Sequence, residues 1–496
     1  MNKKNFFFLS KIFNKILNDK NSDVITYAID FLNLTRPHND YLIKHEFYLS
    51  KKIFTIIGVI FFFLSFLKWL YRLIENYFYF FLYKKKNLYL NSKVILISHI
   101  REKNHKFDKT NDFVYGKIPH YLELSYKKDN LQIIYINHSS LLSKKFICKD
   151  RNILVLDNIL FLTGEIKILL WQFKEAINVF VNFFLKKKID LHLYLHIFFS
   201  IFSNTTKKNL RLYYQFKKIL KNKNYVMAIS TFEGFAWEKL LFYEIRKCNT
   251  NTKILGYQFT GILRNQDSLK KIKKNIYSPD FILTCGSRNK KILEKSNKYY
   301  KNKIYSVGSN RNILFNVFKK KKFNAPVCLV LPEGTEKETF ILFSYAINVA
   351  TLTKNIKFIL RTHPLIDIKK IIYNIKKKNN YLPNNIIFSN KSFAYDLSLS
   401  NFALYRGSTS IITALSKNLV PIYYKYFGDS FNIDPIYDYK EDKFIVKDVD
   451  DFLNVLNKSS NLKNKINLKK ISYARSFYTT QNKSAIINFF NKITNQ

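Results

Sequence analysis

The stretch "NFALYRGSTSIITALSKNLVPIYY", residues 401–424, decides the fold. It reads as a short apolar strand, a polar loop, a helix and a second apolar strand. Strands that alternate with helices are typical of parallel sheets with crossover connections. The same order recurs in "DFILTCGSRNKKILEK" (280–295) and in "VCLVLPEGTEKETF" (327–340). The sequence therefore predicts an α/β protein built from repeated strand–loop–helix units.

The α/β units fall into two blocks, separated by a lysine run that ends before Pro326. We expect a helical, aromatic region over 1–90 and a first Rossmann-like domain over 91–315. A second Rossmann-like domain over 316–447 would follow, and then a helical tail over 448–496. The predicted fold class is thus two Rossmann-like domains that face a cleft.

The chain is strongly basic, with 83 lysines and arginines against 35 acidic residues and a formal charge of +48. Such a charge suits nucleic acid or an anionic membrane. The chain is also crowded with Lys, Asn, Ile, Phe and Tyr, which an AT-rich coding bias produces without selection for binding. Since no RNP-like, zinc-finger or helix-turn-helix pattern is present, we expect no nucleic-acid partner.

The four cysteines form no C-x-x-C pair. This spacing argues against a zinc site and a disulfide framework, and it fits a reducing cytoplasm. Cys285 and Cys328 lie inside apolar runs, so we expect both in the core.

One uncharged segment, "IFTIIGVIFFFLSFL", covers residues 53–67. A bilayer span needs about 20 apolar residues, so this segment is short for one. Lys51, Lys52 and Lys84–Lys86 flank it and suit a membrane interface. We expect peripheral association with the inner face of the cell membrane; a true span and a buried helix are the alternatives.

Polar residues follow three predicted strands of the second block, where open α/β sheets bind their ligands. Gly407 lets a ligand approach the backbone, and a helix that begins beside it offers free N–H groups to phosphate. Arginines add forked donors, and His363 can hydrogen-bond or protonate a leaving phosphate. The predicted nucleotide- and phosphate-binding residues are Glu333, Gly334, Thr335, Arg361, His363, Arg406, Gly407, Ser408, Thr409 and Ser410.

Each of these residues also has a structural explanation. A Ser or Thr before a helix is often only its N-cap, and Thr335 and Glu338 have the spacing of a capping box. Glu333 could complement a helix dipole, and Arg361 could pair with a structural carboxylate. The order of the three loops nevertheless favours a site for an anionic ligand.

In the first block, "STFEGFAWEKL" (230–240) places Glu233 in a loop between a strand and a helix. A loop carboxylate that faces a cleft can accept a hydroxyl proton, so Glu233 is the candidate general base. A carboxylate at the helix entry is the alternative, and we expect a structural role for Glu238. The predicted acceptor or cleft residues are Trp237, Gln258, Arg264 and Arg311.

The segments "FEGFAWEK", "GYQFTG", "LPEGTEKE", "RTHP" and "ALYRGSTSIITAL" resemble a family of bacterial surface carbohydrate biosynthesis proteins, roughly over residues 92–445. That family is similar to GT-B glycosyltransferases and, more distantly, to bacterial sialyltransferases and capsule polysialyltransferases. The resemblance implies that Glu233 is the base, that His363 is the phosphate ligand or acid, and that Ser408 and Thr409 contact the nucleotide. Those sialyltransferases usually carry two acidic residues before the glycine, whereas Phe232 stands here. "PEG" at 332–334 is a rival match, so the functional carboxylate is either Glu233 or Glu333.

We therefore expect a metal-independent glycosyltransferase that needs no cofactor. It would transfer a sugar from a nucleotide-activated donor, with a cytidine nucleotide as one option. The acceptor would be a growing surface polysaccharide, such as lipopolysaccharide or capsule, or a lipid-linked molecule. No D-x-D pattern suggests a metal at the phosphates. The alternatives are a nucleotide-sugar epimerase, a cytidine-activated alcohol phosphotransferase, and a non-catalytic basic protein that binds membrane or nucleic acid.

Overall fold

The structure is a computed structural model in which part of the chain is placed well enough to describe. The described residues are 3–33, 59–60, 63–64, 66–71, 73–74, 92–100, 111–126, 130–137, 152–156, 158–311, 325–363, 366–378, 382–427, 429, 432–458 and 467–494. The linker predicted before Pro326 lies mostly outside them, and so does most of Ile53–Leu67.

The first domain is a parallel sheet with the strand order β3-β2-β1-β4-β5-β6-β7. Its strands are β1 (Val94–Ile100), β2 (Leu131–Asn137), β3 (Ile153–Leu156), β4 (Met227–Thr231), β5 (Lys253–Gln258), β6 (Phe281–Thr284) and β7 (Ile304–Ser306). Its helices are α6 (Ile118–Tyr126), α7 (Leu162–Val179), α8 (Leu191–Ile201), α9 (Asn204–Leu220), α10 (Ala236–Cys248), α11 (Asp267–Lys270) and α12 (Ser287–Ser296), with a π-helical turn, Phe180–Phe184, after α7.

The second domain repeats this arrangement in the order β10-β9-β8-β11-β12-β13, again all parallel. Its strands are β8 (Val327–Leu331), β9 (Lys357–Leu360), β10 (Ile386–Phe388), β11 (Phe402–Tyr405), β12 (Val420–Tyr424) and β13 (Phe444–Val446). Its helices are α13 (Glu336–Leu352), α14 (Ile368–Lys378), α15 (Phe393–Leu399), α16 (Ser410–Ser416) and α17 (Val449–Lys458). Both sheets have the doubly wound order of Rossmann folds, which confirms the predicted fold class.

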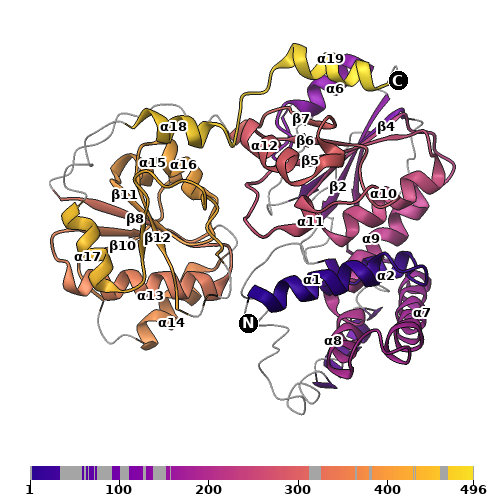
Figure 1. The fold of residues 1–496 in the computed structure, drawn as a ribbon, viewed down its shortest axis with the longest axis horizontal. Coiled ribbons are helices and arrows are strands. Elements are labelled where there is room, and N and C mark those ends of the chain that lie inside the picture. The colour runs from indigo at the N-terminus through magenta and orange to yellow at the C-terminus, as the bar shows by residue number, and fades with distance from the viewer. Residues whose placement is uncertain are drawn as a thin grey trace.

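The apolar runs become central strands because helices cover both faces of each sheet (Figure 1). Every residue of β1, "VILISHI", is buried, and so is every residue of β8, "VCLVL". A strand buried on both faces reads as a continuous apolar run rather than as an alternating one. Cys285 and Cys328 are buried in these cores, as predicted.

The C-terminal region is helical where it is described, and its helices pack on both domains. Helix α17 packs on the second domain, and α18 (Leu468–Arg475) packs against α16. The chain then returns to the first domain, where α19 (Lys483–Thr494) lies beside α6 (Figure 1).

The segment between α18 and α19 lies backbone to backbone against the first sheet. The Thr479 N–H donates to the Cys285 carbonyl at 3.0 Å. A Cβ on Gly286 would lie 2.2 Å from the Phe477 carbonyl oxygen, and one on Gly308 would lie 2.7 Å from the Thr480 carbonyl oxygen. Only glycine leaves room for this crossing, since real Cβ atoms do not approach so closely.

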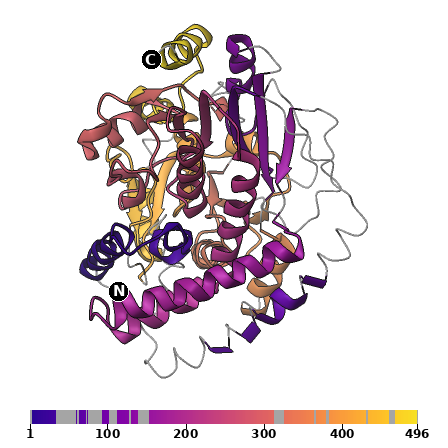
Figure 2. The same ribbon diagram turned by 90° about the vertical axis from the view of Figure 1, so that its right-hand side faces the viewer.

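The N-terminal region confirms its helical prediction where it is described, in α1 (Lys3–Leu17), α2 (Val24–Ala28) and α3 (Asp30–Asn33). These helices share a hydrophobic core with α7, α8 and α9. The long magenta helix that crosses the lower part of Figure 2 is α7. Within the described ranges no helix has both the length and the apolar character needed to cross a membrane.

A buried carboxyl group joins α2 to α7. The Thr26 hydroxyl donates to Glu175 Oε1 at 2.7 Å, and the Asn178 amide donates to Oε2 at 3.2 Å. Burial raises the pKa of Glu175 to about 7. The folded protein therefore binds a proton at this group under conditions in which the unfolded chain has released it.

We expect stability to fall as pH rises from about 4.5 to about 7, because the raised pKa makes ionised Glu175 unfavourable in the fold. Glu175→Gln keeps an acceptor for Thr26 and should remove this term, worth about 2–3 kcal/mol at neutral pH. Denaturant unfolding of both proteins at several pH values measures it. Glu336→Gln, at an exposed ion pair, is the control. Parallel stability curves for wild type and Glu175→Gln would contradict the assignment.

Candidate functional site

The loops that follow β8, β9 and β11 begin at the same edge of the second sheet. Leu331 pairs with Tyr405 across β8 and β11, and Val330 pairs with Leu360 across β8 and β9. In a parallel sheet the carboxyl ends of neighbouring strands open at the same edge. The residues that follow these strands therefore gather at that edge, as the sequence predicted.

The close approach of two glycines shows how these loops fit together. A Cβ on Gly407 would lie 2.3 Å from Glu333 Oε2, and one on Gly334 would lie 3.3 Å from the His363 ring. The Glu333 carboxylate thus lies against the Gly407 backbone, and the His363 imidazole lies against Gly334. Glu333 and His363 are both half-buried. An acid–base group, a carboxylate and two glycine backbones meet at one place.

Thr335 is the N-cap of α13, and its hydroxyl accepts from the Glu338 N–H at 3.3 Å. The predicted capping box is only half formed, because the Glu338 carboxylate binds Arg406 instead. The hydroxyl of Thr335 therefore caps helix α13. An N-cap role was the structural alternative considered for the Ser and Thr residues of these loops.

Arg406 corrects a prediction, because its guanidinium is buried under the site instead of facing a ligand. Nε donates to Glu338 Oε2 at 2.5 Å, Nη2 donates to Asp429 Oδ1 at 2.7 Å, and Nη1 reaches the Tyr424 carbonyl at 3.3 Å. Burial alone would lower the pKa of Arg406, but the two carboxylates raise it. These contacts occupy all three guanidinium nitrogens, so we assign Arg406 a structural role.

Arg361 also pairs with a structural carboxylate, the alternative considered for it. Its Nη1 donates to Asp396 Oδ2 at 2.8 Å and to the Lys391 carbonyl at 2.7 Å. Asp396 is buried at the start of α15 and accepts from the Ser389 hydroxyl at 2.6 Å. The pair turns Arg361 toward α15, at the border of the site.

The hydroxyl loop before α16 lies at the meeting point of the two domains. Ser408 is buried, Thr409 is the N-cap residue, and the Ser410 N–H donates to Ser408 Oγ at 3.4 Å. Across from it, a Cβ on Gly261 would lie 3.6 Å from Thr409 Cγ2. The loop after β5 therefore touches the loop after β11.

Glu233 lies behind that contact, in the loop after β4. Only 1% of its surface is exposed, and both of its carboxylate oxygens lie within 2.8 Å of the Thr260 hydroxyl, which donates to them. Thr260 directly precedes Gly261. Glu233 of the first domain thus lies close, through Thr260 and Gly261, to Thr409 of the second.

Glu238 holds the loop that carries Glu233, in agreement with its predicted structural role. Its buried carboxylate accepts from the backbone N–H groups of Glu233, Gly234 and Phe235 at 3.0, 2.8 and 2.9 Å. Burial raises the pKa of Glu238 to about 8 despite these bonds. Gly234 has φ +86°, a left-handed conformation that favours glycine.

The four predicted acceptor residues have different surroundings, although the Arg311 guanidinium lies over the Phe259 ring, next to Gln258. Trp237 is a buried core residue against the His99 ring, and buried Gln258 donates to the Thr260 carbonyl. Arg311 donates to the Tyr478 hydroxyl at 3.1 Å, which ties it to the C-terminal crossing. Arg264 is exposed. We therefore correct the predicted role of Trp237 to core packing and that of Gln258 to support for Thr260.

His99 is a residue that the sequence analysis missed. Its Nε2 lies 2.9 Å from Thr231 Oγ1, and Thr231 donates to Glu238 Oε1 at 3.2 Å. The apolar run "VILISHI" reads as an ordinary buried strand and hides it. Its place at the carboxyl end of a central strand was the only signal that could have identified it.

Among the described residues, no group of three or more His, Cys, Asp or Glu side chains is arranged to hold a metal ion. The absence of a metal from the reaction stays a prediction from the sequence.

No protein-family model matches the chain, and no curated protein matches it. It is similar to a solved glycosyltransferase from Rickettsia africae ESF-5, at 14% identity over 82% of this chain and 98% of that one, with a TM-score of 0.42. It is also similar to the lipopolysaccharide outer core galactosyltransferase WaaB (13% identity, 81% and 98% covered, TM-score 0.43). A putative UDP-N-acetylglucosamine 2-epimerase from Listeria monocytogenes is similar as well (10% identity, 82% and 98% covered, TM-score 0.46). Likenesses this distant carry no argument about activity.

Replacing Arg406 by Met should destabilise the protein by about 3–5 kcal/mol, because two buried carboxylates lose their counter-charge. Arg361→Met, at a partly exposed pair, should cost much less. Denaturant unfolding of the two variants measures the difference. An Arg406→Met variant within about 1 kcal/mol of wild type would show that the network is not what joins these elements.

Proposed function

We propose that the protein is a glycosyltransferase that uses a nucleotide-activated sugar. The observation that supports this most is the meeting of Glu333, His363 and Gly407 at the carboxyl edge of the second sheet. Doubly wound sheets bind nucleotides at this edge. The resemblance of the sequence motifs to surface carbohydrate biosynthesis proteins points to the same activity.

In the proposed donor site, the backbone at Gly334 and Gly407 lies against the nucleotide. His363 and Ser408 hydrogen-bond its phosphate, since both can donate a proton to an oxygen. Glu333 is itself an anion, so it suits a hydroxyl of the ribose or of the sugar better than a phosphate. These assignments divide the predicted ligand residues by charge, and they leave Arg406 and Arg361 as supports.

In the proposed reaction, Glu233 accepts the proton of an acceptor hydroxyl, whose oxygen then attacks the anomeric carbon of the sugar. The bond between that carbon and the phosphate oxygen breaks, and the nucleotide leaves. His363 and Ser408 stabilise the negative charge that develops on the phosphate. For this step the acceptor hydroxyl takes the place that the Thr260 hydroxyl holds in the structure.

The burial of Glu233 favours one second candidate, a nucleotide-sugar epimerase. Such an enzyme needs no acceptor hydroxyl at Glu233, and Glu333 and His363 could supply its acid–base chemistry from the second domain. Interconversion of a free nucleotide-sugar without any acceptor would distinguish it from a transferase.

We also propose that the enzyme works on the surface of an anionic membrane, where surface polysaccharides are assembled. The support is a row of exposed apolar side chains along α7 and its π-helical extension: Leu162, Ile166, Leu170, Phe173, Ile177, Phe180, Val181 and Leu185. Exposed lysines occur in the same helix and directly after its π-helical extension: Lys167, Lys174 and Lys186–Lys188. An apolar stripe edged by lysines is typical of helices that lie in the membrane interface.

Nucleotide binding can be tested by its effect on stability. One member of a panel of CMP, CDP, UDP and GDP should raise the stability of the purified protein, by about 2.7 kcal/mol at a hundred times its Kd. His363→Ala, Ser408→Ala and Gly407→Ala should lose this effect, the last because its Cβ displaces Glu333. His120→Ala, on α6, is the matched control. Folded protein that no nucleotide stabilises would favour the non-catalytic interpretation instead.

A further prediction concerns the α7 stripe. Leu170→Glu combined with Ile177→Glu should reduce co-sedimentation with phosphatidylglycerol vesicles tenfold or more, since each buried leucine or isoleucine is worth about 1.5–3 kcal/mol. Leu352→Glu places one such charge at an equally exposed leucine of α13 and should leave vesicle binding unchanged; Leu170→Glu alone is the variant of matched charge. Equal vesicle binding by wild type, the α7 double variant and Leu352→Glu would contradict the proposal that α7 lies on the membrane.

A further inference from the structure

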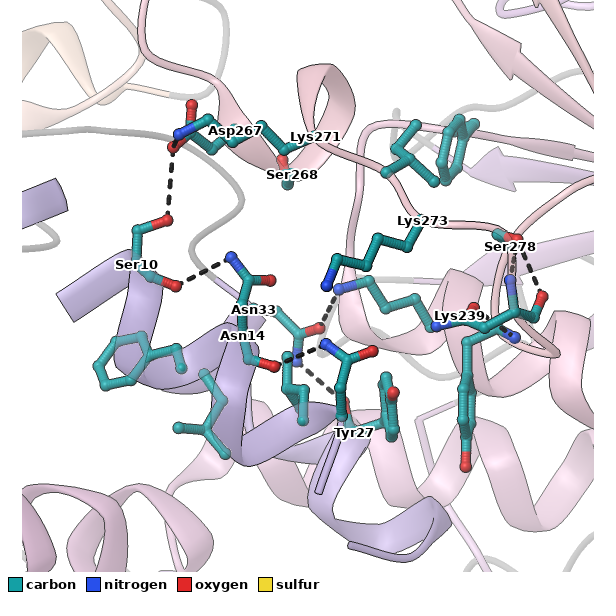
Figure 3. Close-up of a pocket in the computed structure, with 18 residues that line it drawn as sticks. Ser10, Asn14, Tyr27, Asn33, Lys239, Asp267, Ser268, Lys271, Lys273 and Ser278 are labelled. Atoms are coloured by element: carbon teal, nitrogen blue, oxygen red, sulfur yellow. Dashed lines mark hydrogen bonds and ion pairs between the residues drawn. The ribbon is translucent and has the colours of Figure 1, made fainter. Parts of the chain in front are cut away.

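A cavity lies between the N-terminal helix α1 and the segment that contains α11 (Figure 3). Its walls come from α1, from the end of α3, from the start of α10 and from residues 267–278. The cavity has a volume of about 80 Å³. A single water needs roughly 10–15 Å³ when volume is measured in the same way, so several waters or a small anion fit. It is separate from the proposed nucleotide site, because none of its lining residues belongs to the second domain.

The cavity contains an ammonium group that forms no ion pair with a carboxylate among the described residues. Lys239 Nζ donates to Asn33 Oδ1 at 2.7 Å, and that oxygen belongs to a neutral amide. Burial lowers the pKa of Lys239 to about 8, although the nearby Glu238 carboxyl raises it. A partly buried charge without an anion is costly, and an anionic ligand would remove that cost.

Two more lysines line the same cavity. The side chain of Lys273 lies alongside that of Lys239 in Figure 3, and Lys271 pairs with Asp267 at 2.7 Å. Three ammonium groups against one carboxylate leave two positive charges uncompensated. Hydroxyl and amide groups of Asn14, Ser268 and Ser278 complete the polar lining. Two excess positive charges match a phosphate group near neutral pH, whose second pKa is about 6.

We infer that this cavity binds a phosphate group, held between Lys239 and Lys273. The compact ammonium of lysine binds phosphate as a point charge. The phosphate can be carried by a lipid or by a soluble molecule, since the cavity encloses only the anionic group.

The location of the cavity suggests which molecule carries the phosphate. Ser268 lines the cavity and its hydroxyl donates to the Glu233 carbonyl at 3.5 Å, and Phe232 lines it as well. The cavity therefore lies on the back of the loop that holds the proposed base. If the protein is the proposed glycosyltransferase, the phosphate belongs to the sugar acceptor. The acceptor is then a phosphorylated or phosphate-linked molecule. This identification of the carrier rests on the proposed function.

The test is titration calorimetry of the full-length protein with inorganic phosphate. Lys239→Met and Lys273→Met should each raise the Kd for phosphate tenfold or more. Lys274→Met is the matched control, because Lys274 is the next residue along the chain and lies near the Tyr299 ring outside the cavity. Lys273 is exposed, so its variant keeps the fold even if Lys239→Met does not.

Vesicles of phosphatidylcholine with and without phosphatidic acid distinguish the two sources. Loss of the extra binding to phosphatidic acid in Lys273→Met assigns a lipid phosphate, and an unchanged response assigns a soluble one. Phosphate binding that survives in both cavity variants, or that is lost in His363→Ala alone, overturns the inference. Nucleotide stabilisation measured on the same samples reports separately on the proposed function, so the two can fail independently.

Discussion

The candidate site depends on one buried charge, the guanidinium of Arg406. It follows β11 directly, and its partners belong to two other elements, Glu338 in α13 and Asp429 after β12. A buried guanidinium must be matched by carboxylates, so these elements have little freedom to move apart. Gly407, which the Glu333 carboxylate approaches, directly follows Arg406 in the chain. The buried ion pairs of Arg406 therefore help to fix the loop that carries Gly407.

In the first domain, the loop after β4 is held by a buried carboxyl group without an arginine. Glu238 accepts three backbone N–H groups and so holds the turn that contains Glu233. These backbone donors hold the Glu238 carboxyl group in place, but they do not offset its burial, which raises its pKa to about 8. Both domains thus place a glutamate after a strand and a second, buried glutamate in the following helix, which holds the Glu233 turn in the first domain and Arg406 in the second.

The sequence was sufficient for the fold and for the loops that converge. Apolar runs such as "VCLVL" report burial on both faces, and the glycines after them mark places of close approach. It was not sufficient for Arg406, because a residue at a strand end can face outward or turn under the sheet edge. The prediction for Trp237 was wrong because a side chain in the first turn of α10 can face the core instead of the ligand edge. His99 was hidden inside an apolar run. The basic cavity was out of reach, since Asn33 and Lys239 are far apart in sequence and meet only through tertiary packing.

The return of the chain end to the first sheet has a consequence for synthesis. Phe477, Ile486 and Phe490 belong to the same core cluster as β1, β4 and β6. During translation the first domain emerges early, but its core and its β6–β7 edge stay incomplete until the last helix has left the ribosome. At about 5–20 residues per second, this leaves the unfinished domain exposed for many seconds. The first domain to be made is thus the last to be completed.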